Sequence, residues 1–335
     1  DRGVLLAAIL TAVQRPILTT APAFGLDAPV QGTGKTYLAQ CLGALATGET
    51  PPVYPHTAGR DDDEIRKRLT SVLITGARVM VWDNVMGAFN SASMASMLTS
   101  EVFSDRILGK SENATIPSRM LMLLTGNNLT FEGELPRRVL KCRLDAQLAN
   151  PATRKFSSNP LYYILGNRAV LVQAALTIIR GYMQSWEHIS GGAFAGESTA
   201  SFEDWDAMIR QPVAWIAGAL GRDEFEDPAQ ALKDAVAEDP EIERLAGLLE
   251  GIEQLIGLNW FAAKDLQTIL APHHPFIAGV AGDVRDLVEE MLGRSNFTAG
   301  SLGKLLAFRK DRIAGDLKLV VHKANRRTRF KLVRV

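Results

Sequence analysis

The chain has 335 residues, which is enough for two or three domains, and its 37 basic and 37 acidic residues give a formal net charge of zero. Hydrophobic residues make up 47% and charged residues 22%, as in soluble globular proteins, which excludes a disordered tail. No apolar run approaches the ~18 residues of a membrane span, and the two cysteines, Cys41 and Cys142, form neither a disulfide framework nor a zinc pattern, so we expect a cytoplasmic protein without a membrane partner.

Short apolar runs alternate with amphipathic stretches up to about residue 146. We expect helices at Val4–Val13, Thr36–Ala46 and Asp61–Ile74, and strands at Ala23–Ala28, Pro51–His56, Val79–Trp82, Arg119–Thr125 and Val139–Leu144. Continuous apolar runs such as Val79–Trp82 are typical of strands that are buried on both faces. The alternation predicts an α/β fold over residues 1–150, in which a parallel sheet lies between helices on both faces in three layers.

The remaining chain is predicted to be mostly helical. Residues 151–222 read as a helical extension with helices at Tyr162–Met183 and Phe202–Leu220, whose tryptophans we assign to the core. Residues 223–254 read as an acidic linker that runs into a helix. For residues 255–335 we expect three helices and then a β-hairpin formed by Leu317–Val321 and Arg329–Val335, which is the order of a winged helix.

The zero net charge conceals two strongly charged segments. Residues 223–254 contain eleven acidic and two basic residues, a net charge of −9, whereas residues 301–335 contain eleven basic and two acidic residues, a net charge of +9. The basic segment indicates a phosphate-rich partner, for which Lys323, Arg326 and Arg327 near the hairpin turn are the candidate DNA-binding residues. Docking of the basic segment onto the acidic one, and a merely solvated basic surface, are the alternatives.

The sequence Pro29-Val-Gln-Gly-Thr-Gly-Lys-Thr36 ends a predicted strand and opens a predicted helix, as a P-loop requires. Glycines allow backbone N–H groups to turn toward a phosphate, and the helix directs its positive end at the anion. We therefore expect ATP to contact Gly32, Thr33, Gly34, Lys35, Thr36 and Tyr37. Lys35 is expected to contact the β- and γ-phosphates and Thr36 to ligate Mg²⁺.

Asp83 and Asn84 follow the apolar run Val79–Trp82. A P-loop needs a carboxylate at the end of a neighbouring strand to hold Mg²⁺, and Asp83 is the candidate second metal ligand. Asn84 stands where many ATPases carry a glutamate that polarises the attacking water. Because an amide accepts no proton, either catalysis depends on positioning or the base is elsewhere, with Glu101 and Glu112 as unranked candidates.

Two further motifs follow. Asn127 ends an apolar strand and is a candidate for contacting the γ-phosphate or the attacking water. Arg137 and Arg138 precede the last strand of the predicted sheet and are candidate arginine fingers that reach the γ-phosphate of a neighbouring subunit. A polar turn and a solvated basic turn are the respective alternatives.

Together these residues resemble the AAA+ ATPases and, within them, the superfamily 3 helicases, as found in primase-helicase proteins of phages and mobile genetic elements. The resemblance covers about residues 24–144. It implies a ring, such as a hexamer, with each ATP site built between subunits, and a hairpin whose Lys110 grips single-stranded DNA in the channel. It also implies a primase or polymerase module on a longer chain, consistent with a sequence that starts Asp-Arg-Gly without an initiator Met. Pro29 and Asn84 depart from the commonest AAA+ pattern.

The first functional hypothesis is therefore an ATP-driven helicase or translocase that acts on single-stranded or forked DNA. The second is a DNA-binding replication initiator or loader for which ATP is a switch, favoured by Asn84 in place of a glutamate. The third is an AAA+ remodeller of proteins. Stimulation of ATP hydrolysis by single-stranded DNA and strand separation on a fork distinguish the three.

Overall fold

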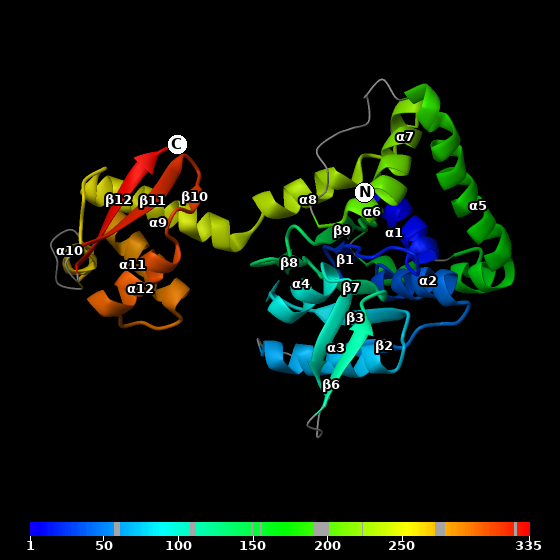
Figure 1. The fold of residues 1–335 in the computed structure, drawn as a ribbon, viewed down its shortest axis with the longest axis horizontal. Helices are drawn as coiled ribbons and strands as arrows, with labels where there is room; N and C mark the ends of the chain where they lie inside the picture. Colours follow the sequence, from blue (N-terminus) through cyan, green and yellow to red (C-terminus); the bar gives the residue numbers. More distant parts are fainter. Residues whose placement is uncertain are drawn as a thin grey trace. The chain divides into compact units, whose positions relative to one another are not determined.

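A computed structural model describes residues 1–56, 61–107, 112–148, 150–154, 156–189, 201–222, 224–271, 279–324 and 327–335. The chain forms two compact units, residues 1–239 and 240–335 (Figure 1). The first unit contains the P-loop sequence, and the second contains the basic C-terminal segment.

The first unit is built on a five-stranded parallel sheet. Its strands are β1 (Ala23–Ala28), β2 (Val53–Pro55), β3 (Val79–Val85), β7 (Leu121–Asn127) and β9 (Val139–Arg143), in the order β2-β3-β7-β1-β9. β1 pairs with both β7 and β9, with Phe24 opposite Leu123 and Leu140. The predicted α/β fold with a parallel sheet is thus confirmed, and the strand that leads into the P-loop sequence has a neighbour on each side.

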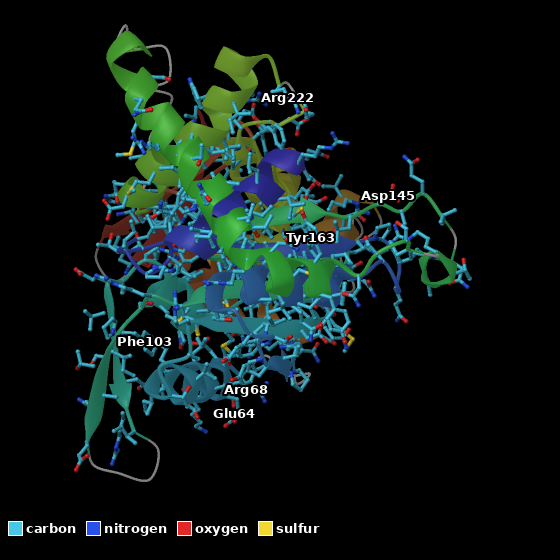
Figure 2. The ribbon with its side chains drawn as sticks, turned by 90° about the vertical axis from the view of Figure 1, so that its right-hand side faces the viewer. Glu64, Arg68, Phe103, Asp145, Tyr163 and Arg222 are labelled. Atoms are coloured by element: carbon cyan, nitrogen blue, oxygen red, sulfur yellow. The ribbon has the colours of Figure 1, made fainter. Side chains whose placement is uncertain are left out.

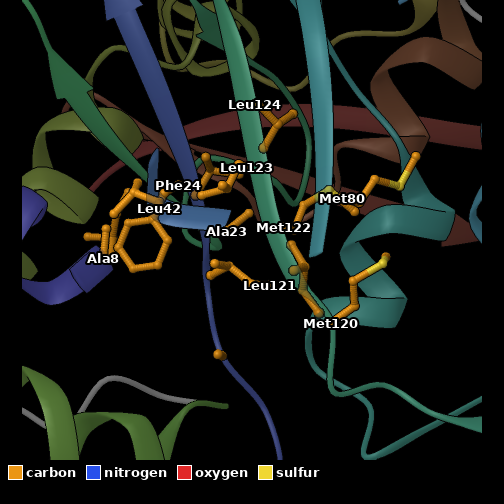
Figure 3. Packing of buried hydrophobic residues seen from close by; sticks show 14 of the residues in the cluster. Ala8, Ala23, Phe24, Leu42, Met80, Met120, Leu121, Met122, Leu123 and Leu124 are labelled. Carbon is orange, nitrogen blue, oxygen red and sulfur yellow. The ribbon is translucent and has the colours of Figure 1, made fainter. Parts of the chain in front are cut away.

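The sheet is buried on both faces, as the continuous apolar runs predicted. All six residues of β1 and the first six of β7 are buried. Figure 3 shows Phe24 of β1 and Leu42 of the next helix near Leu123 of β7. It also shows Met122 of β7 near Met80 of the adjacent strand β3. This helix, α2 (Lys35–Thr47), contacts β1, β3 and β7, and so fixes the P-loop against the centre of the sheet.

Further helices surround this sheet. α1 (Arg2–Gln14) packs on α2, and α3 (Asp62–Ile74) packs on α4 (Ala92–Leu98). The start of α3 follows from its sequence, because Asp61 caps the amide of Asp63 and three acidic residues occupy the first turn. Two short strands, β4 (Ala88–Phe89) and β8 (Thr130–Phe131), form a separate parallel pair.

An antiparallel hairpin, β5 (Val102–Arg106) and β6 (Asn113–Pro117), extends from the first unit (Figure 2). Its first strand is anchored to α3, because the carboxylate of Asp105 accepts hydrogen bonds from Arg66 at 2.7 Å and from Thr70 at 2.6 Å. Lys110, the predicted DNA-gripping residue, belongs to residues 108–111 between the strands, which lie outside the described residues. The predicted hairpin is therefore present in its two strands, which end at Arg106 and begin again at Asn113.

After β9, the chain forms η1 (Pro151–Thr153), a short 3₁₀ turn, and then the long helix α5 (Pro160–Ile189), which is kinked at Asn167. Arg168 of α5 donates hydrogen bonds to the carbonyls of Leu45 and Ala46 at the end of α2. Among the described residues, one helical stretch, Pro160–Ser185, is long and apolar enough to cross a membrane, although the sequence analysis had expected none. A single such helix is weak evidence for a membrane partner.

The described residues from 201 to 239 are mainly helical. They comprise α6 (Glu203–Trp205), the π-helical turn η2 (Asp206–Arg210), α7 (Gln211–Leu220) and α8 (Pro228–Ala237). Trp205 and Trp215 are buried, as predicted. The acidic linker expected at residues 223–254 is not one continuous connection: α8 packs against β9 in the first unit, and the next helix belongs to the second unit. The apolar side chains of α8, of which Leu232 and Ala235 are buried, explain this packing.

The described residues of the second unit form four helices and a three-stranded antiparallel sheet. The helices are α9 (Pro240–Ile256), α10 (Ala263–Ile269), α11 (Val280–Leu292) and α12 (Ala299–Phe308), and the strands are β10 (Ile313–Ala314), β11 (Leu317–Ala324) and β12 (Arg327–Arg334). Leucines of α9 and α12 and Phe330 of β12 share one buried core. The predicted sequence of helices followed by a hairpin is present.

Candidate functional site

The P-loop sequence connects β1 to α2, as predicted. Gly32 and Gly34 have φ angles of 74° and 95°, a left-handed backbone that side chains disfavour. Gly34 is the N-cap of α2, so the first amides of the helix have no acceptor within the helix. A loop of this kind at the positive end of a helix is suited to bind an anion.

The Lys35 ammonium lies beside this loop and contacts Asn127. Its Nζ donates to Oδ1 of Asn127 at 2.7 Å, to Oγ1 of Thr33 at 3.2 Å and to the Val30 carbonyl at 3.3 Å. Burial lowers the pKa of Lys35 below its ordinary value. The nearby carboxylates of Asp27 and Asp83 raise this pKa, but by less than burial lowers it. The structure therefore brings together two predicted site residues from β7 and α2.

The Thr36 hydroxyl, in the first turn of α2, faces the Asp83 carboxylate of β3. Thr36 donates to Oδ1 of Asp83 at 2.6 Å, and the hydroxyl of Thr125 on β7 donates to the same oxygen. The two predicted metal ligands are thus adjacent. Thr125 was missed by the sequence analysis, because nothing in an apolar strand marks which hydroxyl will face a carboxylate on the next strand.

Asn84 lies directly after Asp83, in a backbone conformation with φ of 60°. The ladder between β3 and β7 is irregular between Trp82 and Val85, and the Asn84 amide donates to Oγ1 of Thr125 at 3.3 Å. The Asn84 side chain is exposed. This residue is therefore at the carboxyl edge of the sheet with Asp83 and Asn127.

A pocket of ≈ 750 Å³ adjoins the P-loop, a size in the range of small-molecule sites. Its walls include Gly34, Tyr37, Arg154 and Phe156. The Tyr37 hydroxyl hydrogen-bonds the Asn159 side chain and accepts from the amide of Leu161 at 3.3 Å, and Arg154 donates to the Thr33 carbonyl at 2.9 Å. The segment after β9 thus forms one wall beside the loop, and this contribution was not predicted.

Arg137 and Arg138 lie at the opposite edge of the sheet from the P-loop. The Arg138 carbonyl accepts from the amide of Ala23, the first residue of β1, whereas the P-loop follows Ala28. Five residues of strand separate these two edges by about 16 Å. Both guanidiniums pair with Glu134, and the Arg137 side chain is 61% exposed against 18% for Arg138. Neither arginine belongs to the cluster around Lys35 of its own chain.

Glu101 and Glu112, the two candidates for a hydrolytic base, also lie away from this cluster. Glu101 is 3.8 Å from Arg119, just before β7, and its carbonyl accepts from the amide of Ser118, so it belongs to the amino edge. The Glu112 carbonyl accepts from Ile107 on the hairpin. The structure therefore leaves Asn84 beside Asp83 and does not bring either glutamate to them.

Asp27 and Arg143 form a polar connection at the carboxyl edge that the sequence analysis missed. Asp27 of β1 is fully buried, and its carboxylate accepts from Arg143 at 2.6 Å and from the amide of Leu129 at 2.8 Å. Arg143 also contacts Oδ1 of Asn128 at 3.4 Å. An acidic residue inside an otherwise apolar strand was the available signal.

The predicted DNA-binding residues of the second unit are described in part. Lys323 of β11 is exposed. Arg326 lies outside the described residues, and Arg327 pairs with Ala324 through the backbone. Several cations of the basic segment pair instead with acidic residues of α9: Arg309 and Arg312 with Glu241, and Arg334 with Glu253. The expected docking of basic on acidic residues is therefore present, but only for part of the segment.

No family model matches this chain, and no curated protein matches it in sequence. Among solved structures, it is similar to two A form apo structures of the NrS-1 C-terminal region, at 15% and 14% identity with TM-scores of 0.37 and 0.38, covering 99% of this chain and 71% and 70% of those chains. It is also similar to the SCCmec type IV Cch active helicase, at 11% identity and a TM-score of 0.32, covering 100% of this chain and 67% of that one. These similarities are too weak to decide the function of this chain.

Proposed function

We propose that the protein is an ATP-hydrolysing DNA helicase or translocase of the AAA+ type. The observation that carries this proposal is the meeting of four side chains beside the P-loop: Lys35 with Asn127, and Thr36 with Asp83. These pairs come from α2, β3 and β7, at the carboxyl edge of a parallel sheet, where ligands of open α/β sheets bind. Partial burial of a lysine, an acid and an amide beside the sheet costs folding free energy unless these groups are paired, so their presence points to a ligand site.

In this proposal the backbone amides of the loop hold the triphosphate and Lys35 neutralises charge on its outer phosphates. Asn127, now bonded to Lys35, can exchange that bond for one to the γ-phosphate or the attacking water. The pocket beside Tyr37 and Arg154 has room for the nucleoside. Asn84 orients water without removing its proton, so that catalysis comes from positioning and charge.

The oxygen atoms of Thr36 and Asp83 also suit Mg²⁺, which prefers hard oxygen ligands and is commonly held by one or two protein groups together with substrate phosphates. When bound there, the ion would neutralise charge that develops on the transferred phosphoryl group. The hydroxyl of Thr125 holds the Asp83 carboxylate in place, and thereby fixes the ligand before the nucleotide arrives.

Two further parts of the proposal concern assembly and DNA. Since Arg137 and Arg138 lie a strand's length away from the P-loop of their own chain, they would serve the site of a neighbouring subunit in a ring. The second unit, with its helices and basic hairpin, would bind DNA as a winged-helix-like domain. The hairpin β5–β6 would carry Lys110 toward a strand in the ring channel.

The direct test is the rate of ATP hydrolysis with Mg²⁺, with and without single-stranded DNA, together with unwinding of a forked duplex. We expect hydrolysis that DNA stimulates, and we expect Lys35→Ala to abolish it. Lys67→Ala is the matched control, because Lys67 is an exposed lysine of the same unit that pairs only with Glu64 among the described residues. Equal rates in wild type and Lys35→Ala would reject the proposal.

Asn84 favours a second candidate, a replication initiator or loader in which ATP acts as a switch. An amide in place of a carboxylate accepts no proton, so Asn84 cannot act as the general base of a fast hydrolase and predicts slow turnover. ATP-dependent changes in DNA affinity without unwinding of the fork would identify this function.

A further inference from the structure

The outer face of the C-terminal hairpin carries cations for which the described residues provide no acidic partner. In the register of β11 and β12, Leu319 lies opposite Leu332 and Val321 opposite Phe330, and these residues face the core. Because side chains alternate along a strand, His322, Arg329 and Lys331 share the other face. Within the described part of the chain, neither Arg329 nor Lys331 makes an ion pair, in contrast to Arg309, Arg312 and Arg334.

Trp260 lies across this same face. The neighbouring Phe261 extends the sheet at the free edge of β12, exchanging two backbone hydrogen bonds with Phe330 at 2.9 and 2.8 Å. The rings of Phe261 and Phe330 contact each other on the core side, so that Trp260 is directed to the outer side. There its indole meets the ring of His322 on β11, with centroids 5.9 Å apart at 67°.

The indole thus spans β12 at the position of its two cations, and it remains 44% exposed. A tryptophan that packs only to stabilise a hairpin would be expected to hide more of its surface. Arg329 and Lys331 are two residues apart on one strand face, about 6.6 Å. An exposed aromatic ring beside a row of cations is the combination that proteins use to hold single-stranded nucleic acid, by stacking of a base and contacts to phosphates.

We infer that Trp260, with Arg329 and Lys331, forms a binding surface for single-stranded nucleic acid on the outer face of β11 and β12, with one unpaired base stacked on the indole. A duplex fits this surface less well, because its base faces are covered by their neighbours. The inference rests on the proposed function for the presence of DNA, but it assigns the contact to residues other than the cations predicted near the hairpin turn and other than the residues of the P-loop.

Binding of a fluorescent oligo-dT to the full chain, measured by anisotropy without nucleotide, tests the inference independently of ATP hydrolysis. Base stacking is worth about 1–3 kcal/mol, so Trp260→Ala should weaken binding at least fivefold. Trp260→Phe keeps an aromatic ring and should recover part of the loss. Phe308→Ala is the matched control in the same unit: its ring is 74% exposed beside Arg309 and Arg312, which pair with Glu241, and we expect a change below twofold.

The contribution of Arg329 and Lys331 is tested by measuring how binding of oligo-dT depends on salt concentration. Each phosphate contact to a single strand contributes about −0.7 to the slope of log K against log salt, so Arg329→Gln with Lys331→Gln should flatten the slope by about 1.4. Unchanged binding in Trp260→Ala, an equal loss in Phe308→Ala, or tighter binding of a hairpin duplex than of oligo-dT would overturn the inference. A protein that binds oligo-dT through Trp260 but hydrolyses no ATP would keep the inference and reject the proposed function.

Discussion

The guanidinium of Arg143 and the buried carboxylate of Asp27 lie 2.6 Å apart at the carboxyl edge of the sheet. Asp27 is fully enclosed in the strand that leads into the P-loop, while the Arg143 side chain is 45% exposed at the end of β9. Through Leu129 and Asn128, the same pair holds the turn that follows Asn127. One ion pair therefore connects the P-loop strand with the strand that carries the Asn127 contact to Lys35.

Removal of Arg143 should reduce hydrolysis more than nucleotide binding. Arg143→Met leaves the Asp27 carboxylate buried without its counter-ion, and we expect a loss of about 1–3 kcal/mol in unfolding free energy, reduced from the cost of a fully buried pair because Arg143 is partly solvated. We expect kcat to fall at least tenfold with a smaller change in KM. Arg222→Met, at an exposed surface pair with Glu224, should change neither.

A double variant separates positioning from damage to the fold. If the pair acts as a unit, Asp27→Asn together with Arg143→Met should lose less than the sum of the two single losses in kcat. Strictly additive losses, or kcat unaffected by Arg143→Met, would contradict a positioning role.

Asp83 should determine how hydrolysis responds to Mg²⁺. Asp83→Asn removes the charge that would attract the cation, and we expect at least a hundredfold fall in kcat and a shift of the Mg²⁺ optimum to higher concentration. The measurement is a Mg²⁺ titration of ATP hydrolysis. Asp145→Asn, after β9, serves as the control carboxylate. An unchanged Mg²⁺ optimum in Asp83→Asn would place the metal elsewhere.

Mixing of two inactive variants should restore activity if sites form between subunits. Lys35→Ala disables the P-loop, and Arg137→Ala with Arg138→Ala disables the opposite edge, by ~10³–10⁵ for a true arginine finger. In a mixed ring, some interfaces combine an intact P-loop with intact arginines, so that hydrolysis should reappear. Persistent inactivity of the mixture, with nucleotide binding preserved in the arginine variant, argues against the shared site.

Asp105 should stabilise the packing of β5 on α3 in a pH-dependent way. Burial raises the pKa of Asp105, but hydrogen bonds from Thr70, the Arg106 amide and Arg66 outweigh it, and the pKa lies below its ordinary value. A lowered pKa in the folded state contributes stability above the unfolded pKa of about 3.9, and this contribution disappears as the pH falls through the folded pKa. Stability from Asp105 is therefore present at pH 7 and lost in acid.

Urea unfolding at pH 7 and at pH 3 tests this expectation. Asp105→Asn should lower the free energy of unfolding by about 1–2 kcal/mol at pH 7, with a smaller difference from wild type at pH 3. Asp63→Asn is the control, because Asp63 pairs with the same Arg66 but is 70% exposed; its effect should be below about 0.5 kcal/mol. A constant difference across pH would exclude the charge of Asp105 as the cause.

Much of the first unit could be predicted from local sequence. Periodicity located α2 and α3 within a residue or so, and the polar residues Asp83 and Asn127 after apolar runs pointed to one edge of the sheet. The partners of these residues could not be predicted: Thr125 and Arg143 act across strands whose order is set by tertiary packing. Long-range polar contacts leave no periodic signal in a single sequence.

The contacts of the two charged segments also could not be predicted from the sequence. Equal and opposite charges suggested either docking or a DNA surface, and the structure shows docking for some of the cations. Arg312 and Arg334 pair with glutamates of α9, whereas Arg329 and Lys331 face outward. For the β12 residues Arg329, Lys331 and Arg334, this difference depends on the strand face that each occupies, which the strand register decides.

Gly34 is required by the backbone conformation at the start of α2. A Cβ built at this position meets nothing within 4 Å, so the glycine is required by the handedness of the backbone and not by crowding. L-alanine would be strained at a φ of 95°, whereas its mirror image, D-alanine, prefers that region. Chirality alone thus disfavours an ordinary side chain at the entrance to α2, and a synthetic protein with a D-residue there would keep the backbone of the loop unchanged.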